Sequence, residues 1–361
     1  MDISLFDFDL PAELIAQEPT ERREDSRMLV VDRARRSFSH HRFSEIVDLL
    51  PKRSRLIRNN AAVLKARLFG QRFNGGAMEC LLVQPADSDN SWWCMLRPGK
   101  KLLRDGGFIL PDGTTARIHD RDADGHYRVE FELAKGVDLQ QLVESHGVMP
   151  LPPYIHRSEN DPRSPMDAVR YQTCYADPAQ KVAAAAPTAG LHFSDAVIDA
   201  LHQRGQRFYD CTLHVGFGTF KPIQTDSVEA HRIHRERYEI DCQTYTALRN
   251  PADGLRLAIG TTVVRTLEDA ARRFGGLSVN PLPAGSIQAE ADIYLYPPAD
   301  FLMVDALLTN FHLPRSTLLC LVSAFLDPRG TSGVDFLHQL YREAIRERYR
   351  FFSYGDCMLI L

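Results

Sequence analysis

The segment Val182–Phe193, which reads VAAAAPTAGLHF, constrains the fold of this chain more than any other stretch. A run of alanines ends at Pro187, which fixes φ, and at Gly190, which permits positive φ, so a buried small-residue segment is expected to turn here. Ser194 then precedes an apolar helical spacing. The sequence therefore predicts a turn bearing His192 ahead of a helix, which suits a polar or anionic ligand. A plain tight turn with an incidental histidine is the alternative.

Three later stretches show the same sequence pattern, in which an apolar segment is followed by Gly, hydroxyl or His residues. They are Thr212–Phe220 (TLHVGFGTF), Ala258–Thr262 (AIGTT) and Thr309–Pro314 (TNFHLP), the last of which precedes the apolar run Ser316–Leu326. A final helix is expected over Val334–Arg346. Alternating strand-like and helix-like segments are typical of an α/β domain, in which ligands bind at the loops after strand ends.

The residue pattern is different in the part of the chain that precedes these motifs, from about residue 61 to residue 149. Short segments rich in β-branched and aromatic residues alternate with Gly, Pro, Asn and Asp turns, which indicates a small antiparallel sheet or barrel. A helix over Leu139–Ser145 is expected to return the chain. We therefore predict an α/β main domain (1–60 plus 150–361) with an inserted small antiparallel β-barrel-like domain (61–149). The expected strands of the insert are Val63–Phe69, Met78–Gln84, Trp92–Leu96, Thr115–His119 and Tyr127–Leu133.

Charge and cysteine content limit the class of protein. The formal net charge is −4, so a contact with nucleic acid must rest on a local patch. The 7 cysteines are odd in number and contain no C-x-x-C pair, which speaks against a disulfide framework and a thiolate zinc site. No basic region followed by an apolar run opens the chain, and the apolar stretch Leu318–Leu326 is too short to span a bilayer. We expect a soluble, cytoplasmic protein without a membrane partner.

The predicted insert carries a cluster of cations beside two tryptophans, Trp92 and Trp93. Such a cluster can hold an RNA backbone and stack a base. Charge runs are more often plain solvated surface, and in that case RNA would dock on the main domain through Arg22, Arg23 or Arg315. The cations of the candidate RNA-binding patch are Arg97, Lys100, Lys101 and Arg104.

Five strings in fixed order, APTAGLHF, TLHVGFGTF, GTTVVRTLE, LLTNFHLPRSTLL and YRFFSYGD, resemble the S-adenosylmethionine:tRNA ribosyltransferase-isomerase family of the queuosine pathway. The opening FDFDLPAELIAQEPTERREDSRMLVVDR and the strings PLPPYIHR and YQTCYA fit as well, so the resemblance spans nearly the whole chain. It implies transfer and isomerisation of the ribosyl part of S-adenosylmethionine onto the aminomethyl-deazaguanine of a tRNA anticodon. The implied products are epoxyqueuosine, adenine and methionine. S-adenosylmethionine is then a co-substrate, no prosthetic group is expected, tRNA is the partner and the protein is expected to be a monomer.

Such chemistry needs a base beside the sulfonium, an acid for adenine and donors for oxyanions. Histidine suits either proton role because its ordinary pKa is about 6.5. The resemblance points to four catalytic candidates, and which of them is acid or base stays open, as does a purely structural role for each. The candidates are His192, His214, His234 and His312.

The same motifs supply the expected substrate contacts. Hydroxyl and amide groups are expected to donate hydrogen bonds, and the Glu236 carboxylate is expected to face the ammonium of the methionine moiety. His231 and His234 have metal-ligand spacing, but no convincing third ligand follows, so no metal is predicted. The substrate-binding candidates are Thr188, Gly190, Gly216, Gly218, Glu236, Thr261, Thr262 and Asn310.

One segment departs from the family pattern. Where the family usually has GD and then NDT followed by a basic residue, this chain has Arg53-Ser54 and then Asn59-Asn60-Ala61-Ala62. If this segment contacts the ligand, the substrate is altered, whereas if it only caps a strand, the effect is slight. Two alternatives to the family activity therefore stay open. They are a related S-adenosylmethionine-using enzyme with a shifted acceptor, and a non-catalytic RNA-binding protein.

Overall fold

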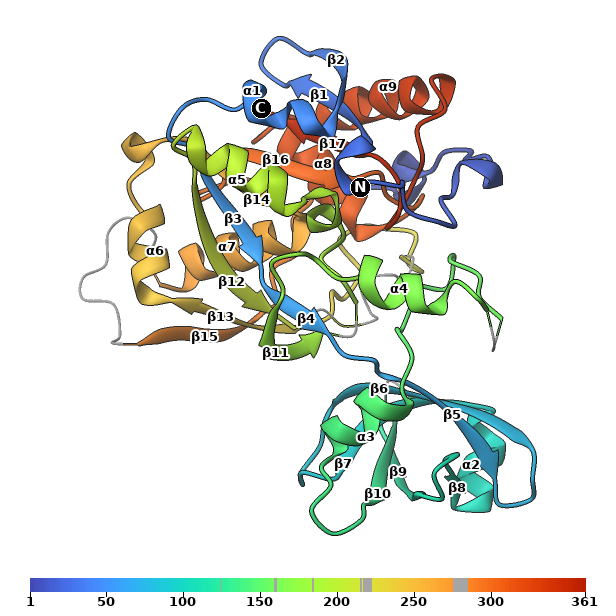
Figure 1. The fold of residues 1–361 in the computed structure, drawn as a ribbon. Coiled ribbons are helices and arrows are strands. Elements are labelled where there is room, and N and C mark those ends of the chain that lie inside the picture. The colour runs from blue at the N-terminus through green and yellow to red at the C-terminus, as the bar shows by residue number, and fades with distance from the viewer. Residues whose placement is uncertain (124, 159–160, 184, 215, 217–222, 275–284) are drawn as a thin grey trace.

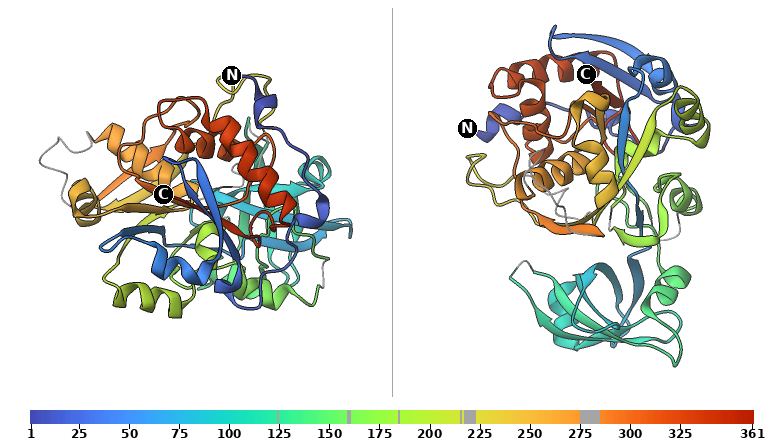
Figure 2. Two further views of the ribbon diagram at one scale, coloured as in Figure 1. Left: turned by 90° about the horizontal axis from the view of Figure 1, so that it is seen from above. Right: turned by 90° about the vertical axis from the view of Figure 1, so that its left-hand side faces the viewer.

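The structure is a computed structural model that describes residues 1–361 except 124, 159–160, 184, 215, 217–222 and 275–284. Within these residues the chain forms two bodies (Figure 1), a large one built on a 9-stranded sheet with helices and a smaller closed barrel. The right-hand view of Figure 2 shows the barrel standing apart from the helices of the large body. The predicted fold class, an α/β domain with an inserted antiparallel barrel, is confirmed.

The 9-stranded sheet is mixed, in the order β15-β13-β12-β3-β14-β16-β17-β1-β2. Its four inner strands β12, β3, β14 and β16 run parallel to one another, while pairs toward the edges are largely antiparallel. Buried parallel strands need apolar residues on both faces, and β14 and β16 are buried throughout. The strands are β1 (Arg27–Asp32), β2 (Ser37–Arg42), β3 (Arg55–Asn59), β12 (Arg207–Leu213), β13 (Glu236–Asp241), β14 (Arg256–Ile259), β15 (Ser286–Ala291), β16 (Ala306–Asn310) and β17 (Cys357–Ile360).

Helix α5 begins after Ser194, where the sequence predicts it. Ser194 caps α5 and Ser316 caps α8, each accepting a hydrogen bond from the backbone N–H three residues on. Gly260, at φ 97°, is the turn residue between β14 and α7, a conformation that a side chain would strain. None of the described helices combines the length and hydrophobicity that crossing a membrane requires. The helices of the large body are α1 (Ile46–Leu49), α4 (Ser164–Arg170), α5 (Asp195–Gln203), α6 (Cys242–Leu248), α7 (Thr261–Arg273), α8 (Thr317–Leu326) and α9 (Gly333–Arg346).

The barrel closes in the order β10-β7-β6-β5-β8-β9 and has a hydrophobic core of its own. Alternate residues of β10 point inward, namely Tyr127, Val129 and Phe131. Gly107 is needed where β8 meets β9, because a Cβ there would lie 2.2 Å from the carbonyl oxygen of Ala116. The elements are β5 (Arg67–Arg72), β6 (Ala77–Pro85), β7 (Ser91–Arg97), α2 (Gly99–Asp105), β8 (Gly107–Ile109), β9 (Thr115–Arg121), β10 (Tyr127–Glu132) and α3 (Leu139–His146).

Two predicted strands have other boundaries in the structure. The strand expected over Val63–Phe69 is divided into β4 (Ala61–Val63) and β5, and β4 pairs with β11 (Asp177–Ala183) outside the barrel. The strand expected over Val182–Ala186 is this β11, which lies earlier in the chain. Pairing between distant segments sets both boundaries, and local residue preference does not report it. The predicted domain limits, 61–149 for the insert, stay a prediction.

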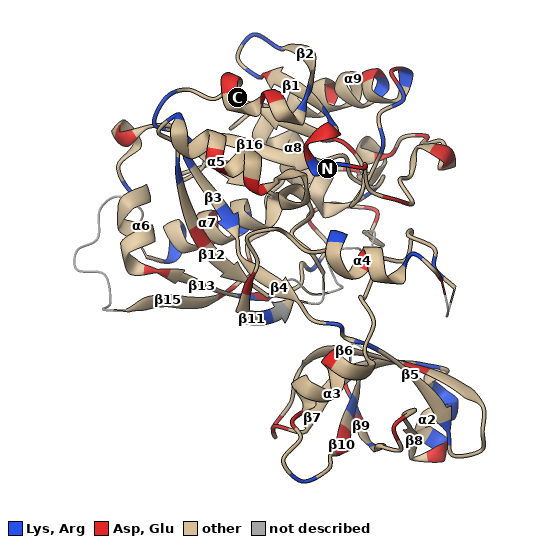
Figure 3. Ribbon diagram, viewed as in Figure 1, with Lys and Arg blue, Asp and Glu red and all other residues tan. Residues whose placement is uncertain are grey.

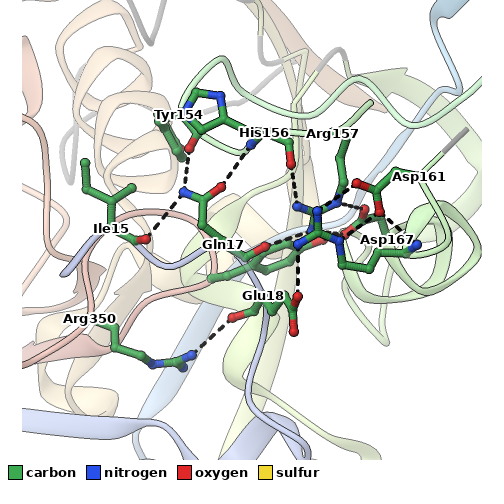
Figure 4. A network of polar contacts seen from close by, with 11 residues as sticks. Ile15, Gln17, Glu18, Tyr154, His156, Arg157, Asp161, Asp167 and Arg350 are labelled. Carbon is green, nitrogen blue, oxygen red and sulfur yellow. Dashed lines mark hydrogen bonds and ion pairs between the residues drawn. The ribbon is translucent and has the colours of Figure 1, made fainter. Parts of the chain in front are cut away.

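The segment that returns from the barrel is tied to the N-terminal segment by a polar network (Figure 4). The Gln17 side-chain amide donates to the carbonyl of Tyr154 at 2.8 Å and accepts from the His156 N–H at 2.9 Å. Arg157 forms an ion pair with Asp167 at 2.6 Å, and both side chains are buried. Asp167 also accepts a hydrogen bond from the Tyr354 hydroxyl at 2.8 Å. This network holds three segments far apart in the sequence in one place.

Replacing Asp167 by Asn is expected to destabilise the large body by about 3–5 kcal/mol, because it leaves the buried Arg157 charge without its counterion. The measurement is the free energy of unfolding in urea. The control is Asp48→Asn, whose partner Arg204 forms an exposed pair and whose loss should cost less than about 1 kcal/mol. Equal losses in the two variants would contradict the prediction.

Candidate functional site

The parallel strands bring the predicted motifs to one edge of the sheet. β14 and β16 are paired in register, Ile259 with Leu308, so the loops that follow them lie side by side. A cavity of about 60 Å³ lies at this edge. We call it the motif cavity. It is lined by Tyr154, Ala186, Pro187, Thr188, Ala189, Gly260, Thr261, Thr262, Thr309, Asn310, Phe311, His312, Leu313, Ser316, Leu318, Phe352 and Ser353.

Five predicted site residues line the motif cavity: Thr188, Thr261, Thr262, Asn310 and His312. Two of them present buried polar atoms, Thr262 Oγ1 and Asn310 Oδ1, which have no hydrogen-bond partner among the described residues. Buried polar atoms are nearly always paired in folded proteins, so an unpaired one beside a cavity points to a ligand. The cavity can therefore donate to and accept from a polar molecule.

His312 is a neutral, buried imidazole in the wall of this cavity. Its Nε2 lies 2.7 Å from Thr309 Oγ1. The Thr309 hydroxyl also lies 3.4 Å from the carbonyl of Asn310, and where it donates to that carbonyl it accepts from Nε2–H and leaves Nδ1 with its lone pair. Burial lowers the pKa of His312 to about 3, which keeps the ring unprotonated at neutral pH. Such a ring can accept a proton or a hydrogen bond.

His192 is buried behind the cavity rather than in its wall. Its ring lies 2.7 Å from Ser26 Oγ and 3.2 Å from Asn310 Nδ2, and it packs against Phe43. Burial, followed by the charges of Arg350 and Arg23, lowers the pKa of His192 to about 3. The geometry therefore favours a role through Asn310 over direct contact with a substrate.

The structure requires a glycine at position 190 for its close packing and not for the positive φ that the sequence suggested. Gly190 lies in a short 3-10 helix, η5 (Thr188–His192), and its φ is not positive. A Cβ at this position would lie 2.0 Å from the Tyr175 hydroxyl and 2.8 Å from a Thr173 methyl. Close packing, not turn geometry, explains this glycine, and the predicted positive φ is wrong.

His234 and Glu236 line a second cavity, which shares Leu318 with the motif cavity. The Glu236 carboxylate pairs with Arg265, both buried, and it accepts from the Gly216 N–H at 3.2 Å. Its charge is thus already balanced inside the protein, which weakens the expected role as partner of a ligand ammonium. In the part of the chain that the structure describes, no three His, Cys, Asp or Glu side chains gather as metal ligands.

His214 follows β12 and lies outside both cavities. The backbone N–H of His214 donates to the backbone carbonyl of Arg237 at 2.9 Å, and the residue is partly exposed. Burial and the charge of Arg237 lower the pKa of His214. Gly218 falls outside the described residues, so the loop expected to bring His214 to a ligand is described only at its start.

The segment that departs from the family pattern ends a strand. Asn59 Oδ1 accepts from the N–H groups of Ala61 and Leu213, and Asn59 Nδ2 donates to the carbonyl of Leu213. Asn60 Oδ1 accepts from the Thr212 hydroxyl at 2.7 Å. The segment lines neither cavity. The Asn59 side chain therefore satisfies backbone groups where β3 and β12 end, and of the altered residues Asn60 bonds to a side-chain hydroxyl.

The predicted cations lie on the barrel (Figure 3). Arg97 ends β7, the other three lie on α2, and all four are exposed. Trp92 and Trp93 are partly buried at the opposite end of β7, about 15 Å from Arg97 at the usual rise per strand residue. A cleft of about 740 Å³ lies beside the barrel and is lined by Arg67 and Arg97, together with residues from 150–163. The four candidate histidines do not line it.

Two of the three arginines named as alternative RNA contacts, Arg22 and Arg23, already bond to other groups of the protein. The Arg23 guanidinium donates to the backbone carbonyls of Leu191, Val169 and Gln172, so it is a structural clamp and not a free cation. Arg22 forms an ion pair with Glu24. Arg315 is exposed, at a φ of 55°.

The residues at or behind the motif cavity that sequence reasoning missed include Ser26, Tyr154, Phe352 and Ser353. Each lies in a string that supports the resemblance, namely ERREDSRM, PLPPYIHR or YRFFSYGD. Tyr154 and Ser353 share a hydrogen bond of 2.7 Å between their hydroxyls. The family strings were therefore the available signal, and only the fold shows that they meet.

The low pKa of His312 predicts how stability depends on pH. Between pH 3 and 6.5 the unfolded chain binds up to one proton more at this site than the folded chain. The contribution of His312 to the free energy of unfolding is therefore fully present above pH 6.5 and decreases as the pH falls toward 3. Replacing His312 by Gln should reduce this slope by up to about 1.4 kcal/mol per pH unit, measured by urea unfolding at pH 5 and 6. Thr309→Val is the control, since it removes the hydrogen bond but not the titrating ring. An unchanged slope in the glutamine variant would show that His312 is not held neutral.

Comparison with known proteins agrees with this arrangement. A family model described as queuosine biosynthesis protein matches residues 3–360. The chain is 43% identical over 363 residues to an S-adenosylmethionine:tRNA ribosyltransferase-isomerase of Geobacter metallireducens and 40% identical over 364 residues to one of Thermotoga petrophila, with 100% of both proteins covered in each case. A crystal structure of S-adenosylmethionine tRNA ribosyltransferase from Thermotoga maritima aligns with a TM-score of 0.53 and 34% identity, over 99% of this chain and 100% of that one. The chain therefore belongs to the queuosine biosynthesis protein family.

Proposed function

We propose that this protein is an S-adenosylmethionine:tRNA ribosyltransferase-isomerase. It transfers and isomerises the ribosyl moiety of S-adenosylmethionine onto the aminomethyl-deazaguanine of a tRNA anticodon, giving epoxyqueuosine with release of adenine and methionine. The observation that carries the proposal is that five family strings, separated by up to about half the chain, meet in one cavity with unpaired polar atoms. Full-length similarity to relatives that bear this name supports it.

The motif cavity is proposed as the place where the reacting part of S-adenosylmethionine is held. A cavity of about 60 Å³ receives only part of that molecule. The hydroxyls of Thr188 and Thr262 are the proposed donors to its oxygens. His312 Nδ1 is the proposed proton acceptor beside the sulfonium, because the ring is neutral and that nitrogen carries the lone pair.

The acid that helps adenine depart is then another group. Burial lowers the pKa values of His312 and His192 to about 3, so at neutral pH neither ring is the imidazolium that could act as a general acid. His214 and His234 remain as candidates from the predicted set. The second cavity, with Glu236 and Arg265, is the proposed neighbour of the methionine moiety.

No observation favours a shifted acceptor, since the departing segment Asn59–Ala62 ends a strand away from both cavities. We also propose that the enzyme is cytoplasmic and monomeric, with tRNA as its macromolecular partner and no prosthetic group. The barrel, residues 61–149 in the predicted division, is proposed to contribute to tRNA binding.

Purified protein incubated with S-adenosylmethionine and tRNA bearing the aminomethyl-deazaguanine is expected to release adenine, measured by chromatography. Thr262→Val should lower turnover at least about tenfold with little loss of stability, because it removes one hydrogen-bond donor from the cavity. Thr246→Val, on the exposed side of α6, is the matched control and should keep full activity. Methyl transfer to tRNA, or no turnover by folded protein, would contradict the proposed function.

Reversing two charges on α2, Lys100→Glu with Lys101→Glu, is expected to weaken tRNA binding and to flatten its dependence on salt, because fewer counterions are released. Affinity for S-adenosylmethionine should not change. The control is Arg35→Glu with Arg342→Glu, an equal charge change in the turn between β1 and β2 and on α9, elements that lie at the other end of the molecule from the barrel (Figure 1).

Filter binding at several salt concentrations distinguishes the outcomes. Equal weakening in both double variants would assign the effect to net charge. Unchanged binding in the α2 variant would show that this patch is solvated surface and that the RNA docks elsewhere.

A further inference from the structure

We propose that Ser26 and His192 are positioning residues that lock the side-chain amide of Asn310, so that its carbonyl oxygen faces the motif cavity and accepts a hydrogen bond from the bound nucleoside. The inference rests on the proposed function, whose site it refines. It assigns to His192 a role in substrate selection in place of proton transfer.

The orientation of the Asn310 amide is determined by its partners. Asn310 Nδ2 donates to the backbone carbonyl of Phe352 at 3.0 Å, and a carbonyl can only accept. Nδ2 also lies 3.2 Å from His192 Nε2. Exchanging the oxygen and nitrogen of the amide would set two acceptors against each other at Phe352, so Oδ1 must lie on the other side.

The orientation of His192 is determined in the same way by Ser26. The Ser26 hydroxyl donates to the backbone carbonyl of Arg23 at 2.9 Å, so its oxygen is left to accept from His192 Nδ1–H at 2.7 Å. His192 Nε2 then carries the lone pair and accepts from Asn310 Nδ2. All three side chains are buried. Each group in this relay therefore has one possible donor direction, and together they exclude the flipped amide.

The relay leaves one atom without a partner. Asn310 is 2% exposed, and its Oδ1 has no hydrogen-bond partner among the described residues, although the residue lines the motif cavity. A buried acceptor of this kind favours a ligand that brings an N–H or O–H group and disfavours one that brings another acceptor. The nucleoside part of S-adenosylmethionine offers two kinds of such donor, the exocyclic amine of adenine and the ribose hydroxyls.

A first experiment examines the relay without any ligand. In histidine-labelled protein, long-range nitrogen–proton NMR spectra at pH 7 should show His192 as the neutral Nδ1–H tautomer, identified by its loss in His192→Gln. Ser26→Ala should shift this signal, whereas Ser323→Ala, which removes an equally buried hydroxyl from α8, should not. A neutral Nε2–H tautomer or a protonated ring in the native protein would overturn the proposal.

A second experiment measures selection by the cavity. Calorimetric titration should show that Ser26→Ala binds S-adenosylmethionine about tenfold more weakly, while Ser26→Thr, which keeps the hydroxyl, and Ser323→Ala bind it like the native protein. The 6-oxo analogue, S-inosylmethionine, and the 2′-deoxy analogue distinguish the amine from the ribose hydroxyl as the donor. One of the two should bind the native protein more weakly, and Ser26→Ala should reduce that difference.

Equal affinity of the native protein for all three ligands would overturn the proposal, as would an unchanged affinity ratio in Ser26→Ala. Failure of the native protein to bind S-adenosylmethionine at all would instead count against the proposed function. In that case the tautomer spectrum still decides whether Ser26 and His192 form the relay.

Discussion

The parallel pairing of β3, β12, β14 and β16 is the constraint on which the rest of the structure depends. Because these strands run in one direction, the segments that follow them emerge at one edge of the sheet. The register of β14 against β16 places Gly260 and Thr261 beside Asn310 and His312. The antiparallel β17 then returns to the same edge, since Cys357 pairs with Asn310. It thereby brings in the Phe352 turn that completes the cavity.

Burial gives the histidines at this edge their chemical character. His192 and His312 are both enclosed, and desolvation holds both rings neutral at physiological pH. A neutral imidazole can accept on one nitrogen and donate from the other, and the neighbouring groups decide which. In the proposed arrangement Thr309 leaves a lone pair on His312 Nδ1, whereas Ser26 leaves one on His192 Nε2. The same residue type thus acts as a candidate proton acceptor at one position and as a support for an amide at the other.

The barrel adds a separate module to this catalytic scaffold. It closes on its own hydrophobic core, and the returning segment is anchored to the large body through Gln17, Arg157 and Asp167. The cations of its candidate RNA-binding patch lie at the end of β7 and on α2, on the smaller body and not in the lining of the motif cavity (Figure 3). The proposed tRNA-binding surface and the motif cavity thus lie on different bodies. A tRNA is long enough to contact both of them at once.

The sequence by itself determined the local elements and the kind of protein. Ser194 and Ser316 mark helix starts through caps that need only neighbouring residues, the alternation in the insert predicts a barrel, and the family strings identify the site loops. Strands β2, β3, β8, β13, β15 and β17 were missed, and so were α2, α4 and α6. Strand β2 forms a hairpin with β1 and β8 one with β9, whereas the other missed strands are defined by pairing with segments farther away in the chain, which local preference does not encode. Only the tertiary structure decided that Glu236 is neutralised by Arg265, that Gly190 makes room for Tyr175, and that His192 supports Asn310. Each of these depends on burial and on a partner distant in sequence, and a side chain's charge, tautomer and available hydrogen bonds follow from those two conditions.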